Sequence, residues 1–338
     1  MAELLELVRV PFLDMDLQIR WRRTAVKANN AVTWLSSLIV ILALVATGVG
    51  LLWPYDGNMF TFTTLRGENV EIWGRGWYRY DTSIIALGFM AGDGVMLLLG
   101  IPLLVISLLR YRRGSLKGGL LLVGTLAYFV YTYGSMTFGA AYNNLFLVYT
   151  ILFAASLFAF VLAFTSIDPQ AVSVRVMSHL PRRSLAIYLI VTGVVLVGVW
   201  GGLSLLPALV QGKAPTELAS YTTVVTHATD LGIIAPTSIL AGILLLRRVP
   251  LGYVWSFTIL VLSWTIGTSV VVGGLLQLLA HELTIGQVLG FVIPFIILNF
   301  VGIWLTFAFL RNLSDAPQGQ ATPSSESGER KANFVTVS

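Results

Sequence analysis

The chain has no cysteine, only three histidines among its 338 residues, and only 11% charged residues. Without thiols it can form no disulfide, no thiolate nucleophile and no Cys-ligated metal or iron–sulfur centre. Three histidines are too few for a histidine-box di-iron centre, and no lysine lies within an apolar run, which excludes a retinal Schiff base. The chain also lacks a Gly-x-Ser-x-Gly elbow and a phosphate-binding glycine loop, so no nucleotide cofactor is indicated.

Hydrophobic residues, in contrast, make up 56% of the chain. A soluble domain carries about 25% charged residues, so a chain this apolar must be solvated mostly by lipid. Crossing the hydrocarbon takes about 20 apolar residues. The sequence therefore predicts an all-α polytopic membrane helix bundle with eight transmembrane helices. The expected spans are 32–53, 83–109, 118–138, 145–166, 185–207, 228–246, 254–280 and 287–310.

Lysine and arginine are distributed unequally between the two sets of loops. All but four of the 21 fall on one side, and the exceptions are Arg66, Arg75, Arg79 and Lys213. Because basic loops stay cytoplasmic, we expect a multi-pass protein of the cell membrane with both termini in the cytoplasm. The net charge of +5 is then a consequence of topology. It indicates no nucleic-acid partner, and the expected partner is the lipid bilayer.

Two aspartates inside apolar runs, Asp93 and Asp230, each lie 17 positions before an arginine. The matched spacing favours an internal duplication, in which two four-helix halves insert in parallel and share a site at their interface. The match is imperfect, because Pro102 lies nine residues after Asp93 and Pro236 six residues after Asp230. Apolar helices also resemble one another by composition alone, so the repeat and its absence both remain open.

These features divide the chain into five segments. An amphipathic segment at the cytoplasmic interface comes first, and a tail rich in Ser, Gly, Pro and Gln, expected to be disordered, comes last. The expected segments are the N-terminal segment 1–29, the first half 30–166 with an outer loop 54–82, a cytoplasmic linker 167–184, the second half 185–312 and the tail 313–338.

The outer loop contains the most distinctive run, residues 64–82, which concentrates charges, aromatics and glycines and could form a short hairpin over the bundle. Further motifs lie in both halves. The motifs are Arg66-Gly67-Glu68, Gly74–Asp81, Asp93…Pro102, Gly124–Tyr133, Tyr142–Tyr149, Asp230–Pro236 and Arg247–Tyr253. With them the chain resembles a widespread family of uncharacterised bacterial and archaeal multi-pass membrane proteins. The resemblance implies a membrane fold and location, and it carries no assigned activity.

A carboxylate at bilayer depth is costly, so it usually has a partner or a function. Counting from the arginines, both intramembrane aspartates should lie in the outer part of the hydrocarbon. We expect a ligand- or proton-binding site there. The candidate residues are Asp93, Asp230, Asp81, Arg79, Glu68, Tyr128 and Tyr131. The alternative is structural: Asp93 pairs with Arg79 or accepts a tyrosine hydroxyl, and the tyrosines belong to an aromatic belt.

A divalent metal site is a second hypothesis. His227 and Asp230 are three positions apart and share a helix face, and His281 and Glu282 are expected at the outer end of the seventh span. Imidazole and carboxylate groups together can bind a metal or relay protons. The alternative is that each group is satisfied locally.

Three functions follow from these candidates. The leading one is a small-solute or ion transporter, or a ligand-responsive membrane protein, with Asp93 and Asp230 as paired coupling carboxylates. An enzyme acting on a lipid or isoprenoid at the outer leaflet is the alternative, so enzymatic activity stays open. The third is a structural subunit of a membrane complex or a homo-oligomer.

Overall fold

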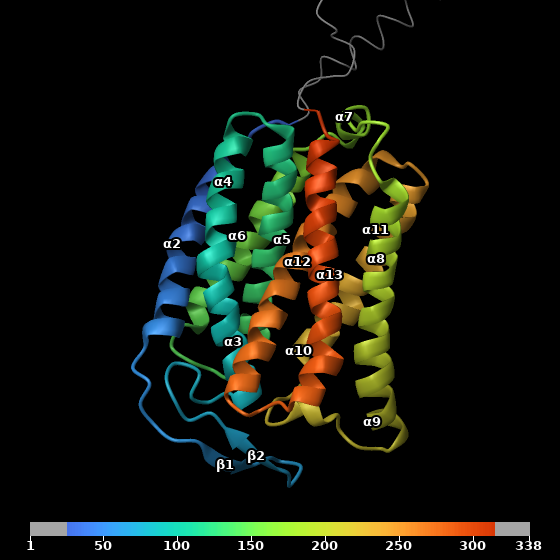
Figure 1. Ribbon diagram of the computed structural model, residues 1–338. Helices are drawn as coiled ribbons and strands as arrows, with labels where there is room; N and C mark the ends of the chain where they lie inside the picture. Colours follow the sequence, from blue (N-terminus) through green and yellow to red (C-terminus); the bar gives the residue numbers. More distant parts are fainter. Residues whose placement is uncertain (1–25, 315–338) are drawn as a thin grey trace, which may run out of the picture.

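The computed structural model describes residues 26–314, and these fold into a bundle of long helices with a small β-hairpin at one end (Figure 1). Within this part of the chain, eight helices are long and apolar enough to cross a membrane. The protein is therefore an all-α polytopic membrane helix bundle, as the sequence predicts. The predicted N-terminal amphipathic segment (apart from residues 26–29) and the predicted disordered tail (apart from 313 and 314) lie outside the described residues.

All eight predicted spans are present, and their ends differ from the predicted ones by a few residues. In chain order they are α2 (Asn30–Leu52), α3–η1–α4 (Ser83–Arg112), α5 (Leu116–Gly139), α6 (Phe146–Thr165), α8–η2–α9 (Arg182–Val210), α10–η4–α11 (Val225–Leu246), α12 (Pro250–Leu279) and α13 (Ile285–Arg311).

Three spans contain a π-helical segment, and in each a proline follows two residues after that segment ends. Proline has no N–H and its ring clashes with the carbonyl four residues earlier, so the hydrogen-bond ladder widens by one residue. The segments are η1 (Met96–Gly100) before Pro102, η2 (Val197–Leu205) before Pro207 and η4 (Asp230–Ile234) before Pro236. Asp230 thus begins its π segment, whereas Asp93 lies three residues before its own.

Helices α5 and α12 form the centre of the bundle. α5 packs against α6 and α4 within the first four spans, and α12 packs against α13 and α11 within the last four. The two groups meet where α12 contacts α5 and α3. At this crossing, a Cβ added to Gly124 would lie 2.6 Å from the Cβ of Val261, so the absent side chain permits the close approach.

One end of the bundle, which we call the hairpin end, carries the predicted hairpin. Strands β1 (Phe60–Thr63) and β2 (Asn69–Ile72) pair antiparallel, with Phe60 opposite Ile72. Gly57 (φ +105°) and Gly74 (φ +67°) lie where the two sides of the loop touch, and a Cβ on either would collide with backbone of the other side.

The opposite end, which we call the linker end, carries residues 166–181 with the short helix α7 (Pro169–Ser173) and the connections after α4 and α11. Both ends of the described chain are tied to the linker, because Val26 bridges to Ile167 and Leu313 to Val176. Residues 26 and 314 therefore lie on the same side of the bundle (Figure 1).

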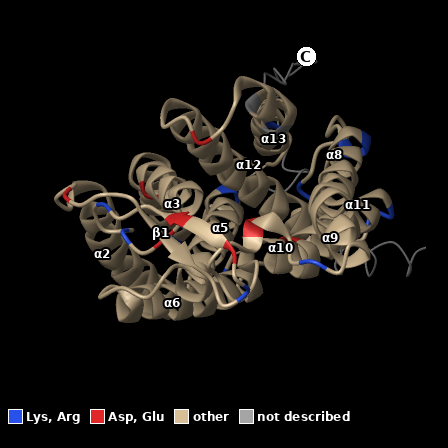
Figure 2. Cartoon of the chain, turned by 90° about the horizontal axis from the view of Figure 1, so that it is seen from below, with Lys and Arg blue, Asp and Glu red and all other residues tan. Residues whose placement is uncertain are grey.

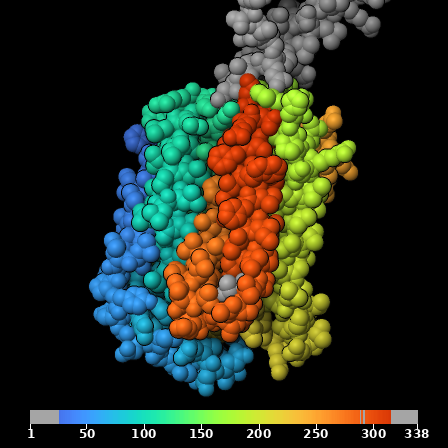
Figure 3. Space-filling view, viewed as in Figure 1, coloured from blue at the N-terminus to red at the C-terminus, as the bar shows by residue number. Residues whose placement is uncertain are grey.

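Helix α13 lies on the surface of the bundle along its whole length (Figure 3). Its side chains Phe300, Trp304 and Phe307 are 72%, 59% and 60% exposed. Large apolar groups exposed on a membrane-spanning helix are typical of a surface in contact with lipid tails. The exposed face of α13 is therefore lipid-facing, which agrees with a membrane-embedded bundle.

Candidate functional site

A pocket of about 330 Å³ opens between the two four-helix groups. Its walls come from the halves of α3, α5 and α12 nearer the hairpin end, from α8–η2 and α10–η4, and from α13. The loop before α10 closes one side with Glu217 and Tyr221. The pocket has the size of a small-molecule site, and most of its wall is apolar with a few polar groups among the apolar side chains.

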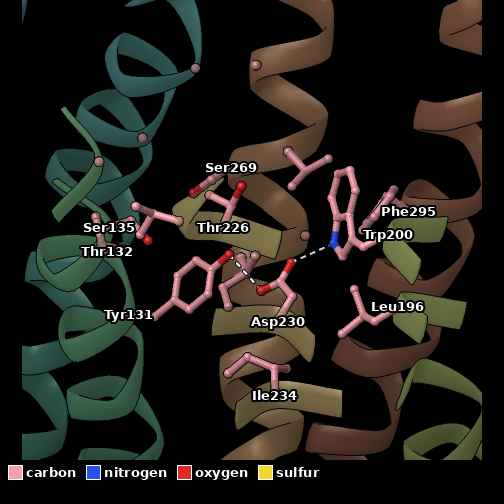
Figure 4. A pocket seen from close by; sticks show the side chains of 18 of the residues that line it. Tyr131, Thr132, Ser135, Leu196, Trp200, Thr226, Asp230, Ile234, Ser269 and Phe295 are labelled. Carbon is pink, nitrogen blue, oxygen red and sulfur yellow. Dashed lines mark hydrogen bonds between the residues drawn. The ribbon is translucent and has the colours of Figure 1, made fainter. Parts of the chain in front are cut away.

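Asp230 is the carboxylate in this pocket. It is 7% exposed, and each of its oxygens accepts one neutral donor. The Tyr131 hydroxyl donates to Oδ1 over 2.9 Å, and the Trp200 indole N–H donates to Oδ2 over 2.8 Å. Figure 4 shows the carboxylate held between these two rings, which come from α5 and η2.

A series of polar contacts leads from Asp230 toward the hairpin end. The Trp200 ring stacks on His227 with centroids 4.1 Å apart. The Nε2 atom of His227 lies 3.4 Å from the hydroxyl of Ser204, which in turn donates to Glu217 over 3.0 Å. Polar groups therefore continue from the bundle interior to the loop, with the indole ring of Trp200 between Asp230 and His227.

Asp93 occupies a different environment. It is 1% exposed, does not line the pocket, and accepts the hydroxyl of Tyr78 over 2.6 Å. Its carboxylate packs directly over Gly50 of α2, so it faces the interior of the first four spans. The structure thus separates the two aspartates that the sequence suggested as a pair, since only Asp230 faces the pocket.

Asp81 joins three separate parts of the hairpin end. Its Oδ1 accepts the backbone N–H of Ala141, between α5 and α6, and the hydroxyl of Tyr221, each over 2.8 Å. Burial raises the pKa of Asp81 to about 6, and the hydrogen bonds from Ala141 and Tyr221 oppose that rise. Burial also raises the pKa of Tyr221, and the nearby Asp81 charge adds to it, so the hydroxyl stays a donor. The carboxyl group is placed to hold the loops together.

The remaining predicted residues fall into two groups. Tyr128 lines the pocket beside Tyr131, and its hydroxyl lies 3.0 Å from that of Ser269. Glu68 instead pairs with Arg66 on the hairpin at 3.3 Å, away from the pocket lining. The suggested pairing of Asp93 with Arg79 is wrong, because Asp93 accepts the tyrosine hydroxyl of the other alternative.

The proposed metal ligands do not come together. His227 stacks on Trp200, whereas His281 and Glu282 lie in the turn after α12. In residues 26–314, no three His, Asp or Glu side chains are grouped so that they could bind a metal. His227 and Asp230 both contact Trp200, and the turn after α12 does not bring His281 and Glu282 into a group with them.

Sequence reasoning missed Trp200 and Tyr78, which donate to the two aspartates, and Glu217, which reaches His227 only through Ser204. A tryptophan in the interior of a predicted span, away from the interface where tryptophan is usual, was a signal for Trp200. Tyr78 lay within the noted loop run, but its reach into the bundle depends on how the loop folds back. Glu217 carried no local signal.

Comparisons with known proteins found no matching family model, curated protein or solved structure. The fold and the site therefore define a class, a polytopic helical membrane protein with a pocket between two helix groups.

Proposed function

We propose that this protein is a small-solute transporter, or a ligand-responsive membrane protein, whose binding site is the pocket beside Asp230. One observation supports the proposal above all. A pocket of about 330 Å³ contains a carboxylate that is hydrogen-bonded only by neutral donors and is walled by helices of both four-helix groups. A site between two groups of helices is the usual position in transporters, because movement of one group against the other changes access to it.

The arrangement of helices supports two parallel four-helix repeats, which we include in the proposal. In each group the second span packs on the first and the third, and the third packs on the fourth. Asp93 and Asp230 lie on corresponding spans, and each span has a π segment followed by a proline, although Asp93 precedes its segment and Asp230 begins its own. The proposed repeat has diverged in function, since only the second copy presents its carboxylate to the pocket.

Orientation and membrane complete the proposal. The excess of lysine and arginine in the loops at the linker end favours the cytoplasmic side for that end, in the cell membrane. The hairpin end would then face outward, with residues 54–82 near the opening. The resemblance to uncharacterised bacterial and archaeal membrane proteins is compatible with this arrangement. A metal-dependent enzyme is not supported, since no three of its four proposed ligands, all of them in the described residues, form a group, and the complex-subunit hypothesis stays a prediction.

Cysteine accessibility provides a direct test, because the chain has no native cysteine. Ser269→Cys places a thiol in the pocket wall, Thr61→Cys an exposed thiol on the hairpin and Gln170→Cys an exposed thiol at the linker end. Each variant would be treated with a membrane-impermeant cationic methanethiosulfonate added from one side of sealed vesicles at a time.

The two surface thiols should each react from one side only, and they identify the sides. If the protein is a transporter, the thiol of Ser269→Cys reacts from both sides as the bundle exchanges between conformations. A ligand-responsive protein would expose it from the hairpin side alone. A thiol at this position that reacts from neither side, while Thr61→Cys is labelled normally, would refute a functional pocket.

A further inference from the structure

The charges in the pocket wall are of one sign. Glu217 and Asp230 line it, and no lysine, arginine or histidine of the described chain does. The only ion pair whose partners both lie in residues 26–314 is that of Arg66 with Glu68, on the hairpin. An ionised carboxylate at this depth needs a counter-charge, and the pocket supplies none of its own.

Asp230 also has unused capacity for hydrogen bonds. Its two oxygens accept one bond each, from Tyr131 and Trp200, whereas a carboxylate offers about four acceptor positions. Figure 4 shows the group pointing between these rings, with Thr226 and Ser269 on one side and Ile234 on the other. An ammonium group entering here would meet a carboxylate already fixed in position, which lowers the entropy lost on binding.

The rest of the wall favours an apolar body with aromatic character. Aromatic rings from four spans face the pocket, and aliphatic side chains fill most of the space between them. The rings include Phe89, Tyr128, Tyr131, Tyr188, Trp200 and Phe295. The faces of such rings attract cations and also stack on aromatic ligands, so they complement both parts of an aromatic amine.

A second carboxylate lies near the opening of the pocket. Glu217 lies on the loop at the hairpin end, beyond Asp230 along the contacts through His227 and Ser204. Seen from that end, acidic residues lie around β1 and beside α10, with basic residues among them (Figure 2). Carboxylates near an opening raise the local concentration of cations.

From these features we propose that the pocket binds an amphipathic organic cation, with an apolar or aromatic body against the rings and one ammonium group at Asp230. The inference rests on the proposed function, since it names the class of solute that the same pocket takes. A pocket of this kind excludes anions, and it binds neutral molecules of the same shape more weakly than the cation.

Three probes with one aromatic body separate these cases: 2-phenylethylamine, which is a cation at pH 7, 2-phenylethanol, which is neutral, and phenylacetate, which is an anion. Each would be tested for protecting the thiol of Ser269→Cys against methyl methanethiosulfonate, a small uncharged reagent that nearby charges neither attract nor repel, and protection is the ratio of the rates without and with the probe in the same variant. The matched background is Ser269→Cys with Asp230→Asn, and Thr61→Cys, far from the pocket, controls for direct effects on the reagent.

We expect the amine to protect at a concentration at least tenfold lower than the alcohol, with no protection by phenylacetate, because one charge pair inside the bundle is worth at least that factor. In the Asp230→Asn background, the amine and the alcohol should protect the thiol at similar concentrations. Equal protection by amine and alcohol in the Asp230 protein, stronger protection by phenylacetate, or no protection by any probe would overturn the inference, and none of these needs the Asn variant to fold.

The outcomes also separate the inference from the proposed function. If the thiol reacts but the amine has no advantage, the pocket remains a site open to water, and only the solute class is wrong. If the thiol of Ser269→Cys does not react at all while that of Thr61→Cys does, the pocket is closed and both fail.

Discussion

Replacing Gly50 with alanine tests the packing around the buried carboxylate of Asp93. A Cβ at this position would lie 3.0 Å from the Cγ of Asp93 and 3.0 Å from the Tyr78 hydroxyl oxygen, and closer still to Oδ2 of Asp93. Overpacking of a rigid core costs about 1–3 kcal/mol. Forcing the 2.6 Å hydrogen bond between Tyr78 and Asp93 apart would leave both groups unsatisfied, at a further cost of about 1–3 kcal/mol.

The chain supplies a matched control two residues away. A Cβ on Gly48 meets nothing within 4 Å, and both glycines lie in α2, so the gain in helix propensity from alanine is similar in the two variants. Gly50→Ala should therefore be about 2–6 kcal/mol less stable than Gly48→Ala. At about 2 °C per kcal/mol for a chain of this size, the unfolding midpoint in detergent should differ by about 4–12 °C.

Thermal unfolding of purified wild type and both variants, at one scan rate and in one detergent, measures this difference. Asp93→Ala provides the second test, because removing the carboxylate removes the obstacle. Adding Gly50→Ala to Asp93→Ala should then cost much less than it does alone, which is the non-additivity expected of residues in contact. Equal midpoints for Gly48→Ala and Gly50→Ala, or strictly additive losses in the double variant, would refute the proposed contact.

Three further outcomes are expected. Because burial raises the pKa of Asp81 to about 6 from an ordinary value of 3.8, the folded state holds its proton more tightly than the unfolded state. The stability contributed by this group is therefore full below about pH 4 and is lost as the pH rises to about 6, a change of about 3 kcal/mol. Unfolding midpoints measured at several pH values should show this change in the wild type and not in Asp81→Asn. Trp200→Phe keeps a ring in place but deletes the donor to Asp230, and it should cost about 1.5–3 kcal/mol in the same unfolding assay; no loss would show that the indole N–H does not hold the carboxylate. Gly124→Ala should cost about 1–3 kcal/mol because its Cβ would press on Val261, and Val261→Ala in the same chain should recover most of that loss unless the two helices cross elsewhere.

The hydrophobic pattern alone was sufficient to predict the eight spans. Each span must form its own backbone hydrogen bonds and match the thickness of the hydrocarbon. The same pattern was also sufficient to single out Asp93 and Asp230, because a carboxylate in an apolar run is conspicuous in any arrangement.

Which carboxylate faces the pocket was decided only by tertiary structure. The direction of a side chain in a membrane helix depends on helix rotation and on which neighbours pack closely, and apolar sequence constrains both weakly. Asp93 points to Gly50 and Tyr78, whereas Asp230 points to Tyr131 and Trp200. Except for Tyr78, these partners lie between 30 and 99 positions away in the sequence. The metal ligands failed for the same reason: His281 and Glu282 were placed at the correct end of α12, but a turn between helices fixed their distance from His227. Sequence determined the position of each polar group along its span, and packing between distant helices determined what it meets there.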